Sequence, residues 1–93
     1  MTPETASDIA VSGLQYLAGD TEQLSRFIAL TGITPQDMRE QAHSPEFMAA
    51  VLDYYLGNEP TLLAFATSCD HKPEDVAKAR YTLVPPDVVD GWE

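Results

Sequence analysis

The sequence predicts an all-helical domain of five or six short helices, and three observations support this class. Apolar residues recur with the three- and four-residue spacing of a helix face along most of the chain. Capping residues stand directly before proline at Thr34-Pro35 and Ser44-Pro45, a pattern typical of helix starts. No stretch alternates apolar and polar residues between hairpin turns, as a half-buried strand would. The short corners between helices favour a compact bundle of crossed helices.

Two stretches match each other at a separation of 38 residues, LQYLAGDTEQLSRF at residues 14–27 and LDYYLGNEPTLLAF at residues 52–65. The coincident positions, which continue beyond these stretches, are Leu14 with Leu52, Tyr16 with Tyr54, Gly19 with Gly57, Leu24 with Leu62, Phe27 with Phe65, Pro35 with Pro73 and Met38 with Val76. One such unit cannot bury both of its apolar faces alone. We therefore expect two similar helical units, residues 4–42 and 43–83, packed together. The alternative is that any two helical hairpins with glycine stops align in this way.

The first unit is expected to contain three helices. The first covers residues 3–18, and Gly13 within its apolar stripe indicates that another helix approaches closely there. Gly19 is expected to end this helix in a left-handed conformation, and Asp20 to cap the next helix with Gln23 as its capping-box partner. Gly32 ends that second helix. The third helix begins with Thr34-Pro35 and is expected to end near residue 42.

The second unit begins with the most apolar helix, predicted over residues 45–56. Its stripe of Met48, Val51, Leu52 and Tyr55 is widened by two further aromatic side chains, so we expect it to be central and buried on more than one side. A Gly57-Asn58 corner leads into a fifth helix, whose apolar face carries Leu62, Phe65, Ala66 and Cys69. A sixth helix is predicted from Pro73 to Leu83, where a double proline follows.

Length and charge limit the kinds of protein this chain can be. Its 93 residues, 44% of them apolar, suit one domain, which we place at residues 1–84 with an acidic tail at residues 85–93. Fifteen acidic and five basic residues give a net charge of −10. Such a charge repels nucleic-acid phosphates and anionic membrane surfaces, and it favours a partner with a basic face.

The sequence indicates a cytoplasmic location. Cys69 is the single cysteine, so no internal disulfide can form and a reducing compartment is expected. The first eight residues, MTPETASD, lack the basic and apolar regions of a signal peptide. No run of about twenty apolar residues is present to span a membrane.

Nearly the whole chain resembles a known family. The segments that carry the resemblance are Leu14-Gln15-Tyr16-Leu17, Gly19-Asp20, Gly32 with Pro35, and Leu56-Gly57-Asn58-Glu59-Pro60. In these segments the chain is similar to a family of short alphaproteobacterial proteins of unknown function. The resemblance implies a small helical protein, and it implies no activity, ligand, cofactor or catalytic residue.

Residues 28–38 have the pattern of a helix-turn-helix, with a glycine turn followed by a capped helix. In that interpretation Gln36, Arg39, Glu40 and His43 would face a DNA groove. The candidate recognition helix, however, carries Asp37 and Glu40 against one arginine, and the chain has no basic footprint. A structural corner is the favoured reading. A transcription-related protein, or an acidic mimic of DNA, is the alternative function that this segment leaves open.

Two groups of residues with metal-binding or nucleophilic chemistry are weak candidates. Asp70, His71, Glu74 and Asp75 lie within one helical turn, but they lack the spacing of known metal motifs and suit an acidic helix start. Cys69 lies near His71, yet its register with an apolar helix face favours a buried small hydrophobe over a nucleophile. We therefore predict no catalytic residue, no metal ligand and no cofactor, and a small enzyme or ligand carrier remains a lesser alternative.

The preferred function is a non-catalytic protein–protein interaction module with an apolar patch rimmed by acids. Its candidate contact residues are Phe47, Tyr54, Tyr55 and Trp92. The equivalence of Tyr16 and Tyr54 allows a paired binding surface, although half-buried core rings are the favoured reading. The partner is expected to be another protein or a second copy of this chain, and neither nucleic acid nor a membrane.

Overall fold

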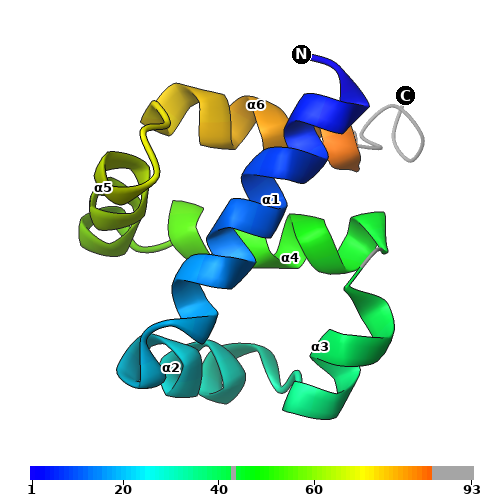
Figure 1. Cartoon of the computed structure of the whole chain (residues 1–93), viewed down its shortest axis with the longest axis vertical. Coiled ribbons are helices and arrows are strands. Elements are labelled where there is room, and N and C mark those ends of the chain that lie inside the picture. The colour runs from blue at the N-terminus through cyan, green and yellow to red at the C-terminus, as the bar shows by residue number, and fades with distance from the viewer. Residues whose placement is uncertain (43, 85–93) are drawn as a thin grey trace, which may run out of the picture.

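Six α-helices follow one another in the computed structural model, which describes residues 1–42 and 44–84 (Figure 1). The helices are α1 Pro3–Ala18, α2 Thr21–Thr31, α3 Pro35–Gln41, α4 Pro45–Leu56, α5 Glu59–Ser68 and α6 Pro73–Leu83. These residues contain no β-strand. The all-helical class is therefore confirmed, and the predicted third helix ends one residue earlier than expected.

Local capping chemistry explains where most of the helices begin. The Thr34 hydroxyl accepts a hydrogen bond from the Asp37 backbone N–H at 3.1 Å, and the Asp37 carboxylate accepts one from the Thr34 N–H at 3.2 Å. The carboxylate of Asp20 caps α2 in the predicted place, but Gln23 does not complete a capping box there. The Gln23 amide oxygen instead accepts from the Tyr54 hydroxyl at 2.7 Å, because a tertiary contact competes with the local one.

The two tight corners have the same backbone geometry, and it differs from the geometry expected. Gly19 has φ −86° and ψ −2°, and Gly57 has φ −84° and ψ −2°, so neither is left-handed. The chain turns instead at the next residue, because Asp20 and Asn58 adopt extended conformations and cap the following helix at once. Among the described glycines, Gly32 is left-handed, with φ 74°. Although the corners correspond, α6 packs on α1 and α4 while α3 has no buried residue, so an internal repeat stays a prediction.

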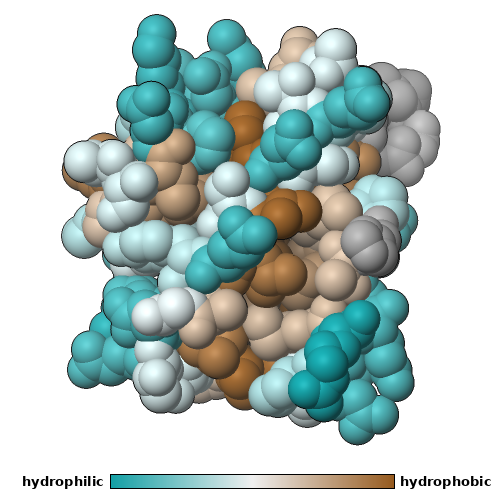
Figure 2. Space-filling view, in the orientation of Figure 1, coloured by the Kyte–Doolittle hydropathy of each residue, from teal (hydrophilic) through white to brown (hydrophobic). Residues whose placement is uncertain are grey.

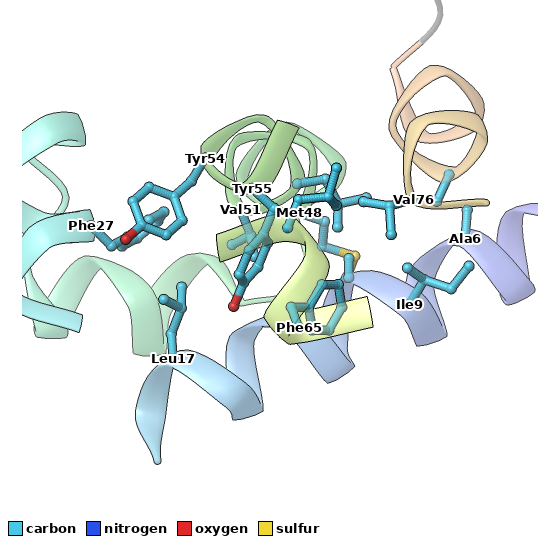
Figure 3. Packing of buried hydrophobic residues seen from close by; sticks show 14 of the residues in the cluster. Ala6, Ile9, Leu17, Phe27, Met48, Val51, Tyr54, Tyr55, Phe65 and Val76 are labelled. Atoms are coloured by element: carbon cyan, nitrogen blue, oxygen red, sulfur yellow. The ribbon is translucent and has the colours of Figure 1, made fainter. Parts of the chain in front are cut away.

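Helix α4 lies at the centre of the core, as predicted, and contacts α1, α5 and α6 (Figure 1). The Tyr55 ring is fully buried in the middle of this core (Figure 3). It stacks on Phe65 with ring centroids 4.4 Å apart. Its hydroxyl donates a hydrogen bond of 2.7 Å to the carbonyl oxygen of Gly13, which satisfies a buried polar group.

Gly13 of α1 lies against the side chains of Tyr55 and Val51 on α4. A Cβ atom at this position would lie 3.0 Å from Cε2 of Tyr55 and 3.3 Å from Cγ1 of Val51. Both distances are shorter than ordinary van der Waals contact between carbon atoms. The close approach of another helix, predicted from a glycine within an apolar stripe, is therefore confirmed.

Candidate functional site

The structure corrects the candidate contact surface. Phe47, Tyr54 and Tyr55 expose only 3%, 7% and 0% of their surfaces and belong to the hydrophobic core. The reason is that α4 is covered by neighbouring helices on several sides, so its wide apolar face is used within the chain. Trp92 lies outside the described residues. The buried side chains of Phe47, Tyr54 and Tyr55 are therefore not available as surface anchors for a partner.

The tyrosines expected to be half-buried are held by contacts within the fold. Tyr54 meets Phe27 edge to face, with centroids 5.4 Å apart, and Tyr16 packs at a tilt against both the Tyr55 and Phe65 rings, at 6.3 and 5.9 Å. Burial raises the pKa of the Tyr54 and Tyr55 hydroxyls above the ordinary value, because the charged phenolate would lose its hydration. These contacts favour the structural reading of the tyrosine pair over a paired binding surface.

The residues considered for metal binding and nucleophilic chemistry do not come together as a site. In residues 1–42 and 44–84, no group of three His, Cys, Asp or Glu side chains is arranged to hold a metal ion. The His71 ring packs near Phe65 with centroids 5.8 Å apart, and its buried Nε2 atom has no hydrogen-bond partner within that part of the chain. Cys69 is half-buried against the core, which agrees with its assignment to an apolar face. His43 lies outside the described residues.

The helix-turn-helix-like segment forms as α2, a left-handed Gly32 and α3. Two of its polar side chains, Gln36 and Asp37, form hydrogen bonds within the segment. The Gln36 amide donates a hydrogen bond of 3.2 Å to the Glu40 carboxylate, and the Asp37 carboxylate caps its own helix. Helix α3 spans seven residues and buries none of them, whereas a recognition helix must be held firmly against its scaffold to read base edges.

An open apolar groove lies between α1, α2 and α3. It encloses about 340 Å³ and is lined by Leu14 and Ala18 of α1, Leu24 of α2, Pro35, Met38 and Arg39 of α3, and Ala42, the C-cap residue of α3. The groove-lining side chains of Leu14, Leu24 and Met38 are half-buried at the edge of the core. In the orientation of Figure 2, apolar atoms gather between α1 and α3. Among the described lining residues only Arg39 carries a charge.

The groove stays open beside α3, which is packed less closely than α6, the helix that begins 38 residues later in the chain. Three apolar groove positions, Leu14, Leu24 and Met38, correspond 38 residues later to Leu52, Leu62 and Val76, which are 0%, 9% and 0% exposed. In the second half of the chain, α4 and α6 are covered by α1. In the first half, no described helix packs closely on α3. The walls of the groove therefore consist of apolar side chains like those of the core, but no described helix covers them.

The groove residues lie at apolar helix-face positions of the sequence, which do not distinguish them from core. Their apolar periodicity is the same as that of buried positions, so it carries no signal of exposure. One indication was available in the third helix, which has a single large apolar anchor, Met38, in only seven residues. A helix of that length with one anchor buries little surface, and the structure shows that its neighbours leave it partly uncovered.

None of the six helices in the described part of the chain has the length and apolar character that crossing a membrane requires. Fold and site together define a small, acidic, all-helical protein with an open apolar groove. The chain belongs to the family described as Protein of unknown function (DUF3572), whose model matches residues 3–86. This confirms the predicted membership in a family of unknown function, while an alphaproteobacterial origin stays a prediction. No curated protein and no solved structure matches the chain.

Proposed function

We propose that this protein is a non-catalytic interaction module that binds another protein through the groove between α1, α2 and α3. The observation that carries the proposal is the chemistry of this groove. Its described lining is apolar apart from Arg39, and it includes leucine and methionine side chains that remain partly exposed. Burying such side chains against a partner is favourable by about 25 cal/mol for each Å² of apolar surface removed from water.

The shape and lining of the groove favour a protein partner over a small molecule. A small-molecule site encloses most of its ligand and directs several polar groups toward it. This groove is open to solvent and has one charged group at its wall, Arg39. An open apolar surface rimmed by polar residues is typical of protein–protein contact. We therefore include the absence of catalysis, and of a cofactor, in the proposal.

The charge of the chain supports a basic partner. A net charge of −10 on 93 residues attracts cationic proteins and increases the rate at which they meet this one. The same charge opposes binding to nucleic acid, where affinity depends on lysine and arginine contacts to phosphate. The proposed setting is the cytoplasm, where basic protein segments are available and Cys69 stays reduced.

Site-specific photocrosslinking in the full chain tests the proposal. A photoreactive amino acid replaces Met38 in the groove, and in a control protein it replaces Leu30, which is on α2 and 69% exposed but outside the groove. We expect a protein that crosslinks at position 38 and not at position 30. That protein is then identified and purified, and its affinity is measured against the wild type and against Met38→Glu and Leu30→Glu.

The proposal requires that Met38→Glu weakens binding of the purified partner and that Leu30→Glu does not. Both substitutions replace an apolar side chain and add one negative charge, so they differ mainly in location. Equal crosslinking at both positions would reject the groove as the contact surface. A turnover that depends on groove residues, without a protein partner, would reject the non-catalytic role.

A further inference from the structure

We infer that the segment that occupies the groove is an amphipathic helix of the partner, with aliphatic side chains along one face and lysine or arginine on its flanks. This inference rests on the proposed function and specifies the kind of partner. It follows from three features of the described residues: the packing at the corresponding positions of the second half, the spacing of the groove residues, and the charge.

The packing of the second half shows what kind of element fills such a groove. Val76 of α6, the counterpart of Met38, is fully buried, and Figure 3 shows it near Ala6 and Ile9 of α1. Ala6 and Ile9 are themselves 0% and 4% exposed. The element that covers these positions is thus a helix with small and aliphatic side chains on one face. A groove with equivalent residues in its walls presents the same kind of surface to a helix from another protein.

The spacing of the groove residues matches the reach of a helix. Pro35 and Met38 of α3 and its C-cap residue Ala42 are three and four residues apart and keep helical backbone angles, which places them on one face. These seven steps of the chain span about 10 Å of helix axis. A partner helix that lies along this face would use apolar residues at positions i, i+3, i+4 and i+7, as other groove-binding helices do. An extended strand is disfavoured because the groove is formed by helices and offers no sheet edge.

The charge indicates the flanks of the partner helix. The acidic chain attracts a helix whose flanking positions are lysine or arginine. Arg39 is the charged residue among those that line the groove, so the positive charges of the partner belong beside the groove and not within it. A basic amphipathic helix therefore suits both the apolar floor of the groove and the net negative charge of the chain.

Binding of designed peptides to the full chain tests this inference. The first probe is a synthetic helix of about 14 residues, four turns, with leucine at the i, i+3, i+4 and i+7 positions and lysine elsewhere. A second probe replaces every lysine with glutamate. A third has the composition of the first in an order that breaks the apolar stripe. Affinity is measured by titration calorimetry for the wild type, Met38→Glu and Leu30→Glu.

We expect the lysine probe to bind the wild type more tightly than either of the other probes. Met38→Glu should weaken that binding by about tenfold or more, the size of effect seen when a central interface anchor is lost. Leu30→Glu should leave the affinity within about twofold, since it makes the same charge change outside the groove. Circular dichroism of both variants checks that the helical fold is retained.

Several results would overturn the inference. If the glutamate probe binds as tightly as the lysine probe, the partner helix does not need basic flanks. If the reordered probe binds equally well, the partner does not need an apolar stripe along one helix face. A wild-type dimer that Met38→Glu dissociates in light scattering would place a second copy in the groove. If the Trp92→Ala variant binds the lysine probe more tightly than the wild type does, the chain's own C-terminal residues compete with the probe for the groove.

The same experiments separate this inference from the proposed function. If a natural partner crosslinks at position 38 but docks through a loop, a strand or an acidic helix, the interaction module stands and the basic helix is wrong. If no partner crosslinks at position 38 and no probe binds, both are wrong. If a partner crosslinks there through a basic amphipathic helix, both are supported.

Discussion

Replacing Gly13 with alanine adds one methyl group where α1 lies against Tyr55 and Val51 of α4. Two effects of opposite sign then compete. Alanine is favoured over glycine within a helix by about 1 kcal/mol, which would stabilise α1. The added Cβ, however, would lie 3.0 Å from Cε2 of Tyr55 and 3.3 Å from Cγ1 of Val51. Inserting a methyl group into a packed core costs about 1 to 3 kcal/mol.

The sign of the net effect depends on whether the Tyr55 ring can move away. The ring is fully buried, and two contacts hold it in place. It stacks on Phe65 with ring centroids 4.4 Å apart, and its hydroxyl donates a hydrogen bond of 2.7 Å to the carbonyl oxygen of Gly13. Displacing the ring would stretch both contacts together. We therefore expect Gly13→Ala to lower the free energy of unfolding by about 1 kcal/mol, the midpoint of the steric cost less the gain in helix propensity.

Urea unfolding followed by circular dichroism measures this effect, provided that the slope m is the same for both proteins. Gly19→Ala is the matched control. Its new Cβ would meet only two backbone oxygens, at 3.6 and 3.7 Å, and its φ of −86° suits alanine. That variant should be as stable as the wild type or more stable by up to about 1 kcal/mol.

A double substitution tests the steric cause directly. Val51→Ala removes the contact at 3.3 Å, so the cost of Gly13→Ala should be smaller in a Val51→Ala background than in the wild type. If Gly13→Ala leaves stability unchanged or raises it, the ring of Tyr55 yields more easily than its contacts indicate. The reasoning that close approach requires glycine at this position would then be refuted.

Three further predictions concern the core, the α2–α3 turn and the groove. Tyr55→Phe should lower the free energy of unfolding by about 1 kcal/mol in neutral urea titrations, because the Gly13 carbonyl loses its buried donor. Burial raises the Tyr55 pKa above 10.0, so its stabilising effect is complete below that pH and is lost as pH rises further; Tyr55→Phe should therefore weaken the alkaline fall of stability. Gly32→Ala should destabilise the chain by about 1 to 2 kcal/mol, because alanine is strained at the φ of 74° that Gly32 adopts. Thermal unfolding measures this effect, and an unchanged melting temperature would contradict a left-handed turn. Met38→Glu should lower the melting temperature only modestly, since Met38 is half-buried at the edge of the core and not within it, and a large drop would show that Met38 belongs to the core.

Helix positions followed from local chemistry and were therefore accessible from the sequence. Thr34-Pro35 and Ser44-Pro45 carry both the capping oxygen and the fixed φ of proline, so helix starts at Pro35 and Pro45 required no knowledge of the rest of the chain. The ends of α1 and α4 were also predicted correctly. The left-handed conformation predicted for Gly19 was wrong, because its φ is −86°. The conformation of Gly19 depends on the backbone angles that Asp20 adopts when it caps α2. The residue type of Gly19 alone does not specify those angles.

Phe47, Tyr54 and Tyr55 were predicted as contact residues, whereas the structure buries them, because a wide apolar face has two possible uses. Phe47 and Tyr54 extend the stripe of α4, and the sequence alone does not show whether such an extension meets a neighbouring helix or a partner protein. The structure places α1, α5 and α6 against α4, and these aromatic side chains contact residues of the same chain. The open groove lies elsewhere, on residues whose pattern had marked them as ordinary core.

By itself the sequence determined the helical class, the helix bounds, the acidic charge and the need for glycine at position 13, because each depends on residues close together or on composition. Only the tertiary structure decided which apolar positions are covered. Leu14 and Leu52 are the same residue at corresponding positions, yet Leu52 is fully buried while Leu14 lines the groove. The difference arises because α6 packs on α1 and α4, whereas α3 buries none of its residues. Burial depends on which other helix reaches a position, and that is a property of the assembled fold.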